Sequence, residues 1–314
     1  MLARGSGARA PAVAGMVLVV IVWATQLPLS QEVLRSIDQY YFAILRYLIG
    51  CALFVGTLAW REGRAGFALE GRARAVAWHG MSGFTVFGVF VFWALYHTTA
   101  AHVSVIMSLQ PMLIAFWLWA RHGRAPSRPV LACIVTAFAG AGLMITRGDP
   151  AQALTGGSLL GDAMAFVGAI GWIVYTLGAA RFPTWSPLRY TTLCALAGTL
   201  GIMGVAAVLT PLGLAQVPSL AAVARELPVI VYIAVAAFYL AILLFTIAVA
   251  RLGAVDTLLI GNATPVLVFL IDVWRGLAPR PAEWLGAGMV VAALIAHNLI
   301  EGRAARRAAV ADGR

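Results

Sequence analysis

The chain has 314 residues, of which 62% are hydrophobic and only 11% are charged, and its formal net charge is +10. Its mean hydropathy is +0.91. Soluble globular domains carry about a quarter charged residues, so this chain has too few polar groups to cover its apolar surface in water. The composition therefore excludes an ordinary soluble domain and indicates an integral membrane protein.

Ten apolar runs follow one another along the chain. A hydrocarbon core of ~30 Å needs about 20 apolar residues per helix, and short connections between several runs predict antiparallel hairpins. A transmembrane β-barrel would show short alternating segments instead. We therefore predict an all-α membrane protein with ten transmembrane helices, at approximately 11–30, 41–60, 76–96, 101–120, 129–146, 159–180, 188–209, 227–250, 254–274 and 282–300.

The first run is longer than the apolar core of a signal peptide, and no clean cleavage site follows it, so we expect it to remain as the first helix. With both termini placed in the cytoplasm, 16 arginines fall in cytoplasmic segments and 5 in outer loops. This bias follows the positive-inside rule. Membrane topology therefore explains the excess of arginine, and no nucleic-acid partner is expected. We expect residues 301–314 to form a basic cytoplasmic tail.

Two halves of the chain resemble each other. Residues 96–117 align with 250–271 at an offset of 154, which places Pro111 on Pro265, and Trp23 aligns with Trp172 at an offset of 149. This order of matches predicts a duplication, with repeat 1 at 11–146 and repeat 2 at 159–300. Because each repeat has five helices, the second copy inserts upside down. Inverted repeats are typical of secondary transporters, which bind substrate near the membrane midplane.

A proline interrupts the ninth run, within the sequence GNATPVLVF at 261–269. Pro265 cannot donate a hydrogen bond and clashes with the carbonyl of Gly261, and Pro111 does the same to Met107. An unsatisfied carbonyl in hydrocarbon is costly, so it needs a local polar partner or a polar cavity. Two compatible interpretations stay open: a kink that shapes the helix, and a kink that also lines the transport pathway.

Taken together, these motifs resemble the drug/metabolite transporter superfamily, in its ten-helix EamA type. The resemblance covers about residues 11–300, although repeat 2 has no clear counterpart of Arg46. It implies a bacterial inner-membrane carrier that exports amino acids, related metabolites or toxic compounds, and one branch of the family exports aromatic amino acids. The residues that carry it are Arg46 to Gly50, Gln110-Pro111, Gly161-Asp162, Trp172 with Tyr175, and Asn262 to Pro265.

Two pairs of candidate substrate-binding residues have the same spacing in the two repeats. Trp23 and Gln26 lie three residues apart, as do Trp172 and Tyr175, so each pair shares one helix face. Inversion would place the pairs on opposite sides of the midplane, facing a common centre. Aromatic faces bind planar or cationic ligands, but the same residues could instead pack helices together or lie at the membrane interface.

Further candidates for substrate binding are His79, Gln110, Tyr239 and Asn262. A histidine inside a membrane helix is a functional hypothesis by default, and its alternative is a solvated position near the basic loop. A buried Arg46 would cost ~2.5–3.5 kcal/mol unless it pairs. It could hold a substrate carboxylate, but we favour a structural tie to a helix end or carbonyl.

Other functional classes lack their motifs. The sequence contains no zinc-protease, nucleophile-elbow or P-loop signature and no deep pair of carboxylates, so we expect no enzyme, no metal and no cofactor. A receptor or assembly factor would need a larger loop than the roughly 17 residues at 210–226. The expected partners are a small-molecule substrate and membrane lipid, and a monomer is compatible with the sequence. A multidrug efflux carrier of the same fold is the main alternative.

Overall fold

The computed structural model describes residues 6–98, 100–123, 127–146, 148–149, 151, 159–274, 276 and 278–311, and every regular element among them is helical. Seven of these helical stretches are long and apolar enough to cross a membrane, and three shorter apolar helices accompany them at 106–120, 128–140 and 281–297. The predicted all-helical fold is therefore confirmed. The total of ten spans and their inverted arrangement stay predictions. The seven long stretches are Arg9–Val33, Gln39–Phe67, Ala73–His97, Leu160–Arg181, Pro187–Leu209, Leu220–Leu252 and Ala254–Ile271.

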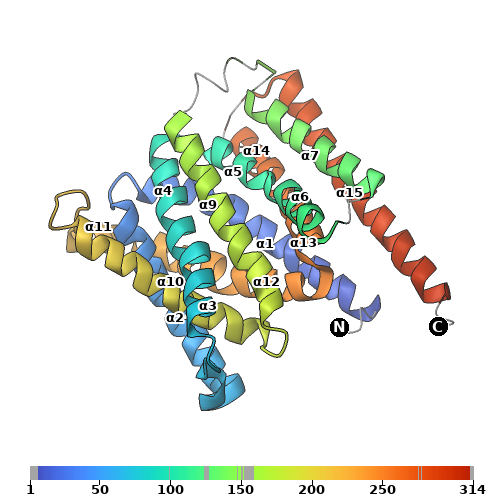
Figure 1. Ribbon diagram of the computed structural model, residues 1–314. Helices are drawn as coiled ribbons and strands as arrows, with labels where there is room; N and C mark the ends of the chain where they lie inside the picture. The colour runs from blue at the N-terminus through green and yellow to red at the C-terminus, as the bar shows by residue number, and fades with distance from the viewer. Residues whose placement is uncertain are drawn as a thin grey trace.

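Within residues 6–146 the chain forms seven α-helices, with one 3₁₀ and one π segment between them (Figure 1). In order they are α1 (Ser6–Val33), α2 (Gln39–Glu62), η1 (Gly63–Phe67), α3 (Ala73–Gly80), the π segment η2 (Met81–Val86), α4 (Phe87–His97), α5 (Ala100–Ser108), α6 (Gln110–His122) and α7 (Arg128–Thr146).

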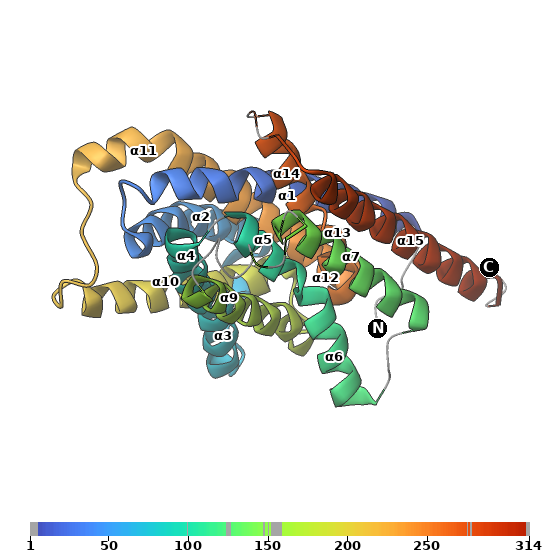
Figure 2. The same cartoon turned by 90° about the horizontal axis from the view of Figure 1, so that it is seen from above.

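From residue 159 onward the described chain is again helical. The elements are α9 (Leu159–Gly178), η3 (Ala179–Arg181), α10 (Pro187–Leu209), α11 (Leu220–Tyr232), the π segment η4 (Ile233–Leu240), α12 (Ala241–Leu252), α13 (Ala254–Gly261), α14 (Thr264–Trp274) and α15 (Pro281–Ala311). The start of α1 and the end of α15 lie on the same side of the molecule in both views (Figures 1 and 2).

Helices from both halves of the chain form one central core, in which α4 packs against α9, α1 against α12 and α10 against α2. The pair α7 and α15 lies at the edge of this core, side by side in Figures 1 and 2. Their backbones approach closely, because a Cβ atom at Gly140 would lie only 2.6 Å from the carbonyl oxygen of Gly286. Small residues permit such contact between membrane helices.

Each π segment packs against two long helices of the other half. The segment η2 contacts α9 and α10, and η4 contacts α1 and α2. Glycines make the first contact possible, since a Cβ atom at Gly171 would lie 2.4 Å from the Ser82 carbonyl oxygen. At the second contact the ring of Phe238 occupies the space where a side chain at Gly50 would begin. π segments inside α-helices often mark functional sites.

Two spans are broken at the predicted prolines. The α5–α6 span is interrupted at Leu109, so that Pro111 lies in the first turn of α6. The α13–α14 span is interrupted at Asn262 and Ala263, so that Pro265 lies in the first turn of α14. Proline is tolerated in a first turn because no intrahelical N–H bond is lost there. The predicted interruptions are confirmed: one residue, Leu109, separates α5 from α6, and two residues, Asn262 and Ala263, separate α13 from α14.

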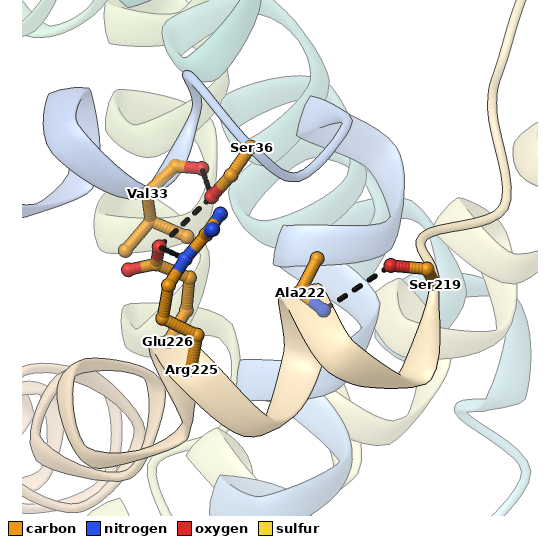
Figure 3. Close-up of polar contacts among 6 residues, drawn as sticks. All are labelled: Val33, Ser36, Ser219, Ala222, Arg225 and Glu226. Carbon is orange, nitrogen blue, oxygen red and sulfur yellow. Dashed lines mark hydrogen bonds and ion pairs between the residues drawn. The ribbon is translucent and has the colours of Figure 1, made fainter.

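A polar contact ties the α1–α2 turn to α11 (Figure 3). The Ser36 hydroxyl donates to Glu226 Oε1 at 3.0 Å, and Arg225 Nε lies 3.1 Å from the same oxygen. Ser219 caps α11 by accepting from the N–H of Ala222 at 3.2 Å. These contacts fix the connection between the first two helices on the second half of the chain.

A second polar contact between the two halves lies beyond the other end of α2. It consists of Glu70, Trp185 and Arg189, and we call it the Glu70 clasp. Glu70 accepts one hydrogen bond from the Trp185 indole at 2.8 Å and pairs with Arg189 Nη2 at 2.7 Å. These two hydrogen bonds, first that from Trp185 and then that from Arg189, hold the pKa of the Glu70 carboxyl below its ordinary value. Charge-assisted bonds of this kind are stronger than neutral ones.

Candidate functional site: a cavity at the two broken helices

A cavity of about 100 Å³ lies where the two broken spans meet α1, α2, α9 and η4. A single water needs roughly 10–15 Å³, so this space exceeds one water site. Its wall is mostly apolar with a few polar groups, as ligand pockets usually are. The lining residues are Trp23, Gln26, Leu27, Arg46, Phe87, Ser104, Met107, Ser108, Gln110, Trp172, Ala237, Ile242, Leu258, Gly261, Asn262, Thr264 and Pro265.

The two helix breaks contact each other through a side-chain amide. Asn262 Nδ2 donates to the Ser108 carbonyl oxygen at 3.2 Å, and this bond joins positions 154 residues apart in the chain. Gln110, beside the other break, donates from Nε2 to the Ala169 carbonyl of α9 at 3.4 Å. For the carbonyls freed by the prolines, the sequence leaves two partners open, a local polar side chain and a polar cavity. Both amide bonds cross to another helix, so these polar residues join the interruptions to neighbouring helices.

Two tryptophans from different halves face each other in the wall of the cavity. The rings of Trp23 on α1 and Trp172 on α9 lie 5.9 Å apart in an edge-to-face arrangement. Phe245 of α12 contacts both rings, at 5.5 and 5.3 Å. The Trp23 indole donates to the Ala237 carbonyl of η4 at 3.2 Å. This bond and the ring packing hold both tryptophans in place as rigid faces.

Arg46 of α2 lies in the wall with its guanidinium surrounded by aromatic rings. Its Cζ lies 4.4 Å from the ring centre of Phe92 and 4.8 Å from that of Tyr47, and Phe238 lies 5.7 Å away. Nη2 donates to the Tyr47 hydroxyl at 3.3 Å, and that hydroxyl donates to the Phe84 carbonyl at 2.9 Å. Among the described residues the guanidinium is therefore tied to a carbonyl indirectly, through the Tyr47 hydroxyl.

Three polar side chains in the wall keep hydrogen-bonding capacity. Within the described part of the chain, Arg46 Nε and Thr264 Oγ1 are buried without a hydrogen-bond partner. The amide of Gln26 is 8% exposed and likewise makes no hydrogen bond to the described residues. Buried polar groups normally make hydrogen bonds. These three side chains can therefore make hydrogen bonds to a polar ligand in the cavity.

The structure brings five of the eight candidate site residues together at this cavity, and the other three lie elsewhere. The five are Trp23, Gln26, Gln110, Trp172 and Asn262. Tyr175 is fully buried behind the wall, where its hydroxyl bonds with Thr191 at 2.9 Å and Thr246 at 3.1 Å. Its hydroxyl contacts α10 and α12, so its contacts are those of a packing residue.

Tyr239 and His79 also lie away from the cavity. The Tyr239 hydroxyl bonds with Thr57 of α2 at 2.7 Å. His79 is 3% exposed and packs on Gly178, where a Cβ atom would lie 2.4 Å from its Nδ1. The alternative of a solvated His79 is therefore wrong, since the close approach of α9 covers the ring. Neither side chain contributes to the wall.

Sequence reasoning missed most of the α5 residues in the wall. Ser104, Met107 and Ser108 line the cavity together with Pro111's neighbour Gln110. Ser104 and Ser108 are one helical turn apart, and such positions share a face. Counting back from the proline in steps of three and four would have identified this face. No group of three His, Cys, Asp or Glu side chains among the described residues is arranged to hold a metal ion.

Comparisons with known proteins agree with this architecture. Residues 10–146 match the EamA-like transporter family. The uncharacterized transporter YrdR of Bacillus subtilis is 30% identical over 284 residues, covering 89% of this chain and 88% of its own. An uncharacterized transporter of Archaeoglobus fulgidus is 26% identical over 193 residues, covering 59% of this chain and 62% of its own.

A solved crystal structure superposes with a TM-score of 0.72 over 93% of this chain and 98% of the other, at 21% identity. At that identity the likeness supports the fold alone. The relationship to YrdR extends over both halves and supplies the assignment. The chain therefore belongs to the EamA-like transporters of the drug/metabolite superfamily and is a multi-pass membrane transporter.

Proposed function

We propose that the protein is a secondary carrier of the bacterial inner membrane that exports small organic metabolites, most of all amino acids, aromatic ones included. The observation that carries the proposal is the cavity at which both broken helices and one tryptophan from each half meet. Substrate sites of secondary transporters lie where discontinuous helices meet near the midplane.

Alternating access requires two halves that can move against each other around a fixed site. The two halves contact each other in a reciprocal way: η2 of the first half packs on α9 and α10, and η4 of the second half packs on α1 and α2. We propose that residues 11–146 and 159–300 are inverted five-helix repeats with both termini in the cytoplasm, and that the cavity opens to each side in turn as they rock.

The wall chemistry suits a compact ligand with one flat or apolar part and one polar part. Trp23 and Trp172 supply aromatic faces, and Gln26, Thr264 and Arg46 supply polar groups. Large hydrophobic drugs would leave these buried polar groups unpaired, at a cost of ~1–3 kcal/mol for each group. This cost favours amino-acid-like substrates over the alternative of multidrug efflux.

The test is uptake and counterflow in proteoliposomes with a panel of labelled amino acids and lipophilic drugs. Trp172→Ala and Asn262→Ala should each reduce flux of the transported compound at least about tenfold, while the purified variants keep a monodisperse elution profile. Trp117→Ala is the matched control, because Trp117 of α6 is 59% exposed and lies outside the wall.

The wild-type protein should move amino acids faster than the drugs. Normal transport by both the Trp172→Ala and the Asn262→Ala variant would place the substrate path outside this cavity. Absence of any protein-dependent flux across the whole panel would contradict the proposed carrier function.

A further inference from the structure

We propose that Arg46 is the anchor for a substrate carboxylate, so that the carrier selects small organic carboxylates and rejects the matching amines. This inference rests on the function proposed above and names the ligand class of the same cavity. Arg46 is 3% exposed, lines the cavity and keeps a buried Nε without a hydrogen-bond partner among the described residues.

No carboxylate side chain of the described residues pairs with Arg46. Its described contacts are the Tyr47 hydroxyl and the rings of Tyr47, Phe92 and Phe238. Cation–π contacts stabilise a desolvated guanidinium but do not neutralise it. Charged side chains inside a membrane are costly and usually face an interior path with a partner of opposite charge. An anionic substrate supplies that partner.

The groups around the guanidinium come from four packed elements, α2, η2, α4 and η4. Tyr47 stacks on Phe238 at 4.5 Å between ring centres, and its hydroxyl is fixed by the Phe84 carbonyl. A Cβ atom at Gly88 would lie 2.6 Å from that hydroxyl, so a larger residue there would displace it. The surrounding groups therefore hold Arg46 in one direction, and such preorganisation favours a bidentate pair with a carboxylate.

The remaining wall complements the rest of such a ligand. The Gln26 amide and Thr264 hydroxyl have unused capacity for a second polar group, and the faces of Trp23 and Trp172 are suited to an apolar or aromatic group. A bare ammonium compound would place a second positive charge beside Arg46 in a low-dielectric space. Like charges in such surroundings repel strongly, so decarboxylated analogues should be excluded.

The experiment compares counterflow of phenylalanine, 3-phenylpropanoate, phenethylamine and phenylalaninamide in proteoliposomes. Wild-type protein should move the two carboxylates at least about tenfold better than the amine and the amide. Arg46→Gln should lower carboxylate transport about 10- to 100-fold, chiefly through the half-saturating concentration, because a charge-assisted pair is lost. Arg46→Lys should retain an intermediate rate, since lysine keeps the charge but lacks the bidentate fork.

Arg61→Gln is the matched control, because Arg61 lies on the same helix but is exposed beside Trp60. Melting temperatures in detergent establish whether each variant is folded. If Arg46→Gln does not fold, the selectivity of the wild-type protein and the rate of Arg46→Lys decide the matter.

Equal transport of carboxylate and amine by wild type, or unchanged carboxylate transport by a folded Arg46→Gln variant, would overturn the carboxylate anchor while leaving the carrier intact. Transport of none of these compounds, nor of any in the wider panel, would remove the proposed function and this inference together.

Discussion

Replacing Gly198 of α10 with alanine should loosen the contact between α10 and the α3–η2 segment. A Cβ atom there would lie 2.4 Å from Phe84 Cβ and 2.6 Å from the Gly80 carbonyl oxygen. Ordinary carbon contacts are ~3.5–4.0 Å, so the two helices must separate by about 1 Å. The obstacle includes backbone, which cannot rotate aside as a flexible side chain would.

The expected loss follows from two opposing effects. Overpacking of this kind costs about 1–3 kcal/mol, and alanine returns ~1 kcal/mol through its higher helix propensity. The difference is a net loss of up to about 2 kcal/mol, which corresponds to an up to roughly 30-fold fall in the folded-to-unfolded ratio. The ring of Phe84 contacts Trp172, and the Phe84 carbonyl oxygen accepts a hydrogen bond from the Tyr47 hydroxyl. Displacement of Phe84 should therefore also reduce transport.

The assay is thermal unfolding of the purified protein in detergent, followed by counterflow of the transported amino acid. Gly204→Ala is the matched control on the same helix, since a Cβ atom there meets nothing within 4 Å. It should keep or slightly raise the melting temperature. Equal melting temperatures for the two variants would refute the close approach between α10 and η2.

Two further predictions concern polar contacts outside and inside the core. Hydrogen bonds from Trp185 and Arg189 lower the pKa of the Glu70 carboxyl. The Glu70 clasp is therefore complete above the ordinary pKa of ~4.3, and it weakens as the pH falls through the lower pKa of the folded protein. Glu70→Gln should therefore flatten the acid limb of a plot of melting temperature against pH; an unchanged limb would contradict the clasp. Asn262→Leu removes the donor to the Ser108 carbonyl and should lower stability in detergent by about 1 kcal/mol, measured by thermal unfolding. A variant as stable as wild type would show that this bond contributes nothing.

The sequence predicted the features that depend on local chemistry. Apolar run length gives the membrane helices because hydrocarbon requires every backbone group to be bonded within its own helix. The prolines at 111 and 265 predicted the interruptions because the missing N–H is a local property. The pairing of Trp23 with Trp172 was predicted from an inverted repeat, which itself stays a prediction; the contact of the two rings at 5.9 Å is observed.

Sequence could not place side chains whose direction is set by packing. Tyr175 shares a face with Trp172 by spacing, but the adjacent hydroxyls of Thr191 and Thr246 hold it behind the wall. The surroundings of Arg46 include η2, α4 and η4, which are distant from it in the chain, so its aromatic seat carries no sequence signature. The π segments η2 and η4 likewise arise from tertiary packing and follow no motif.

The most direct test of the substrate cavity is protection from alkylation. Gly261→Cys is introduced into a background in which Cys51, Cys133 and Cys194 are replaced; a Cβ atom at Gly261 meets nothing within 4 Å and the position lines the cavity. Val217→Cys, in an exposed loop position, is the control. A transported amino acid at saturation should slow modification of the Gly261→Cys variant severalfold and leave the control unchanged. Equal modification rates with and without substrate, in a variant that still transports, would contradict the account.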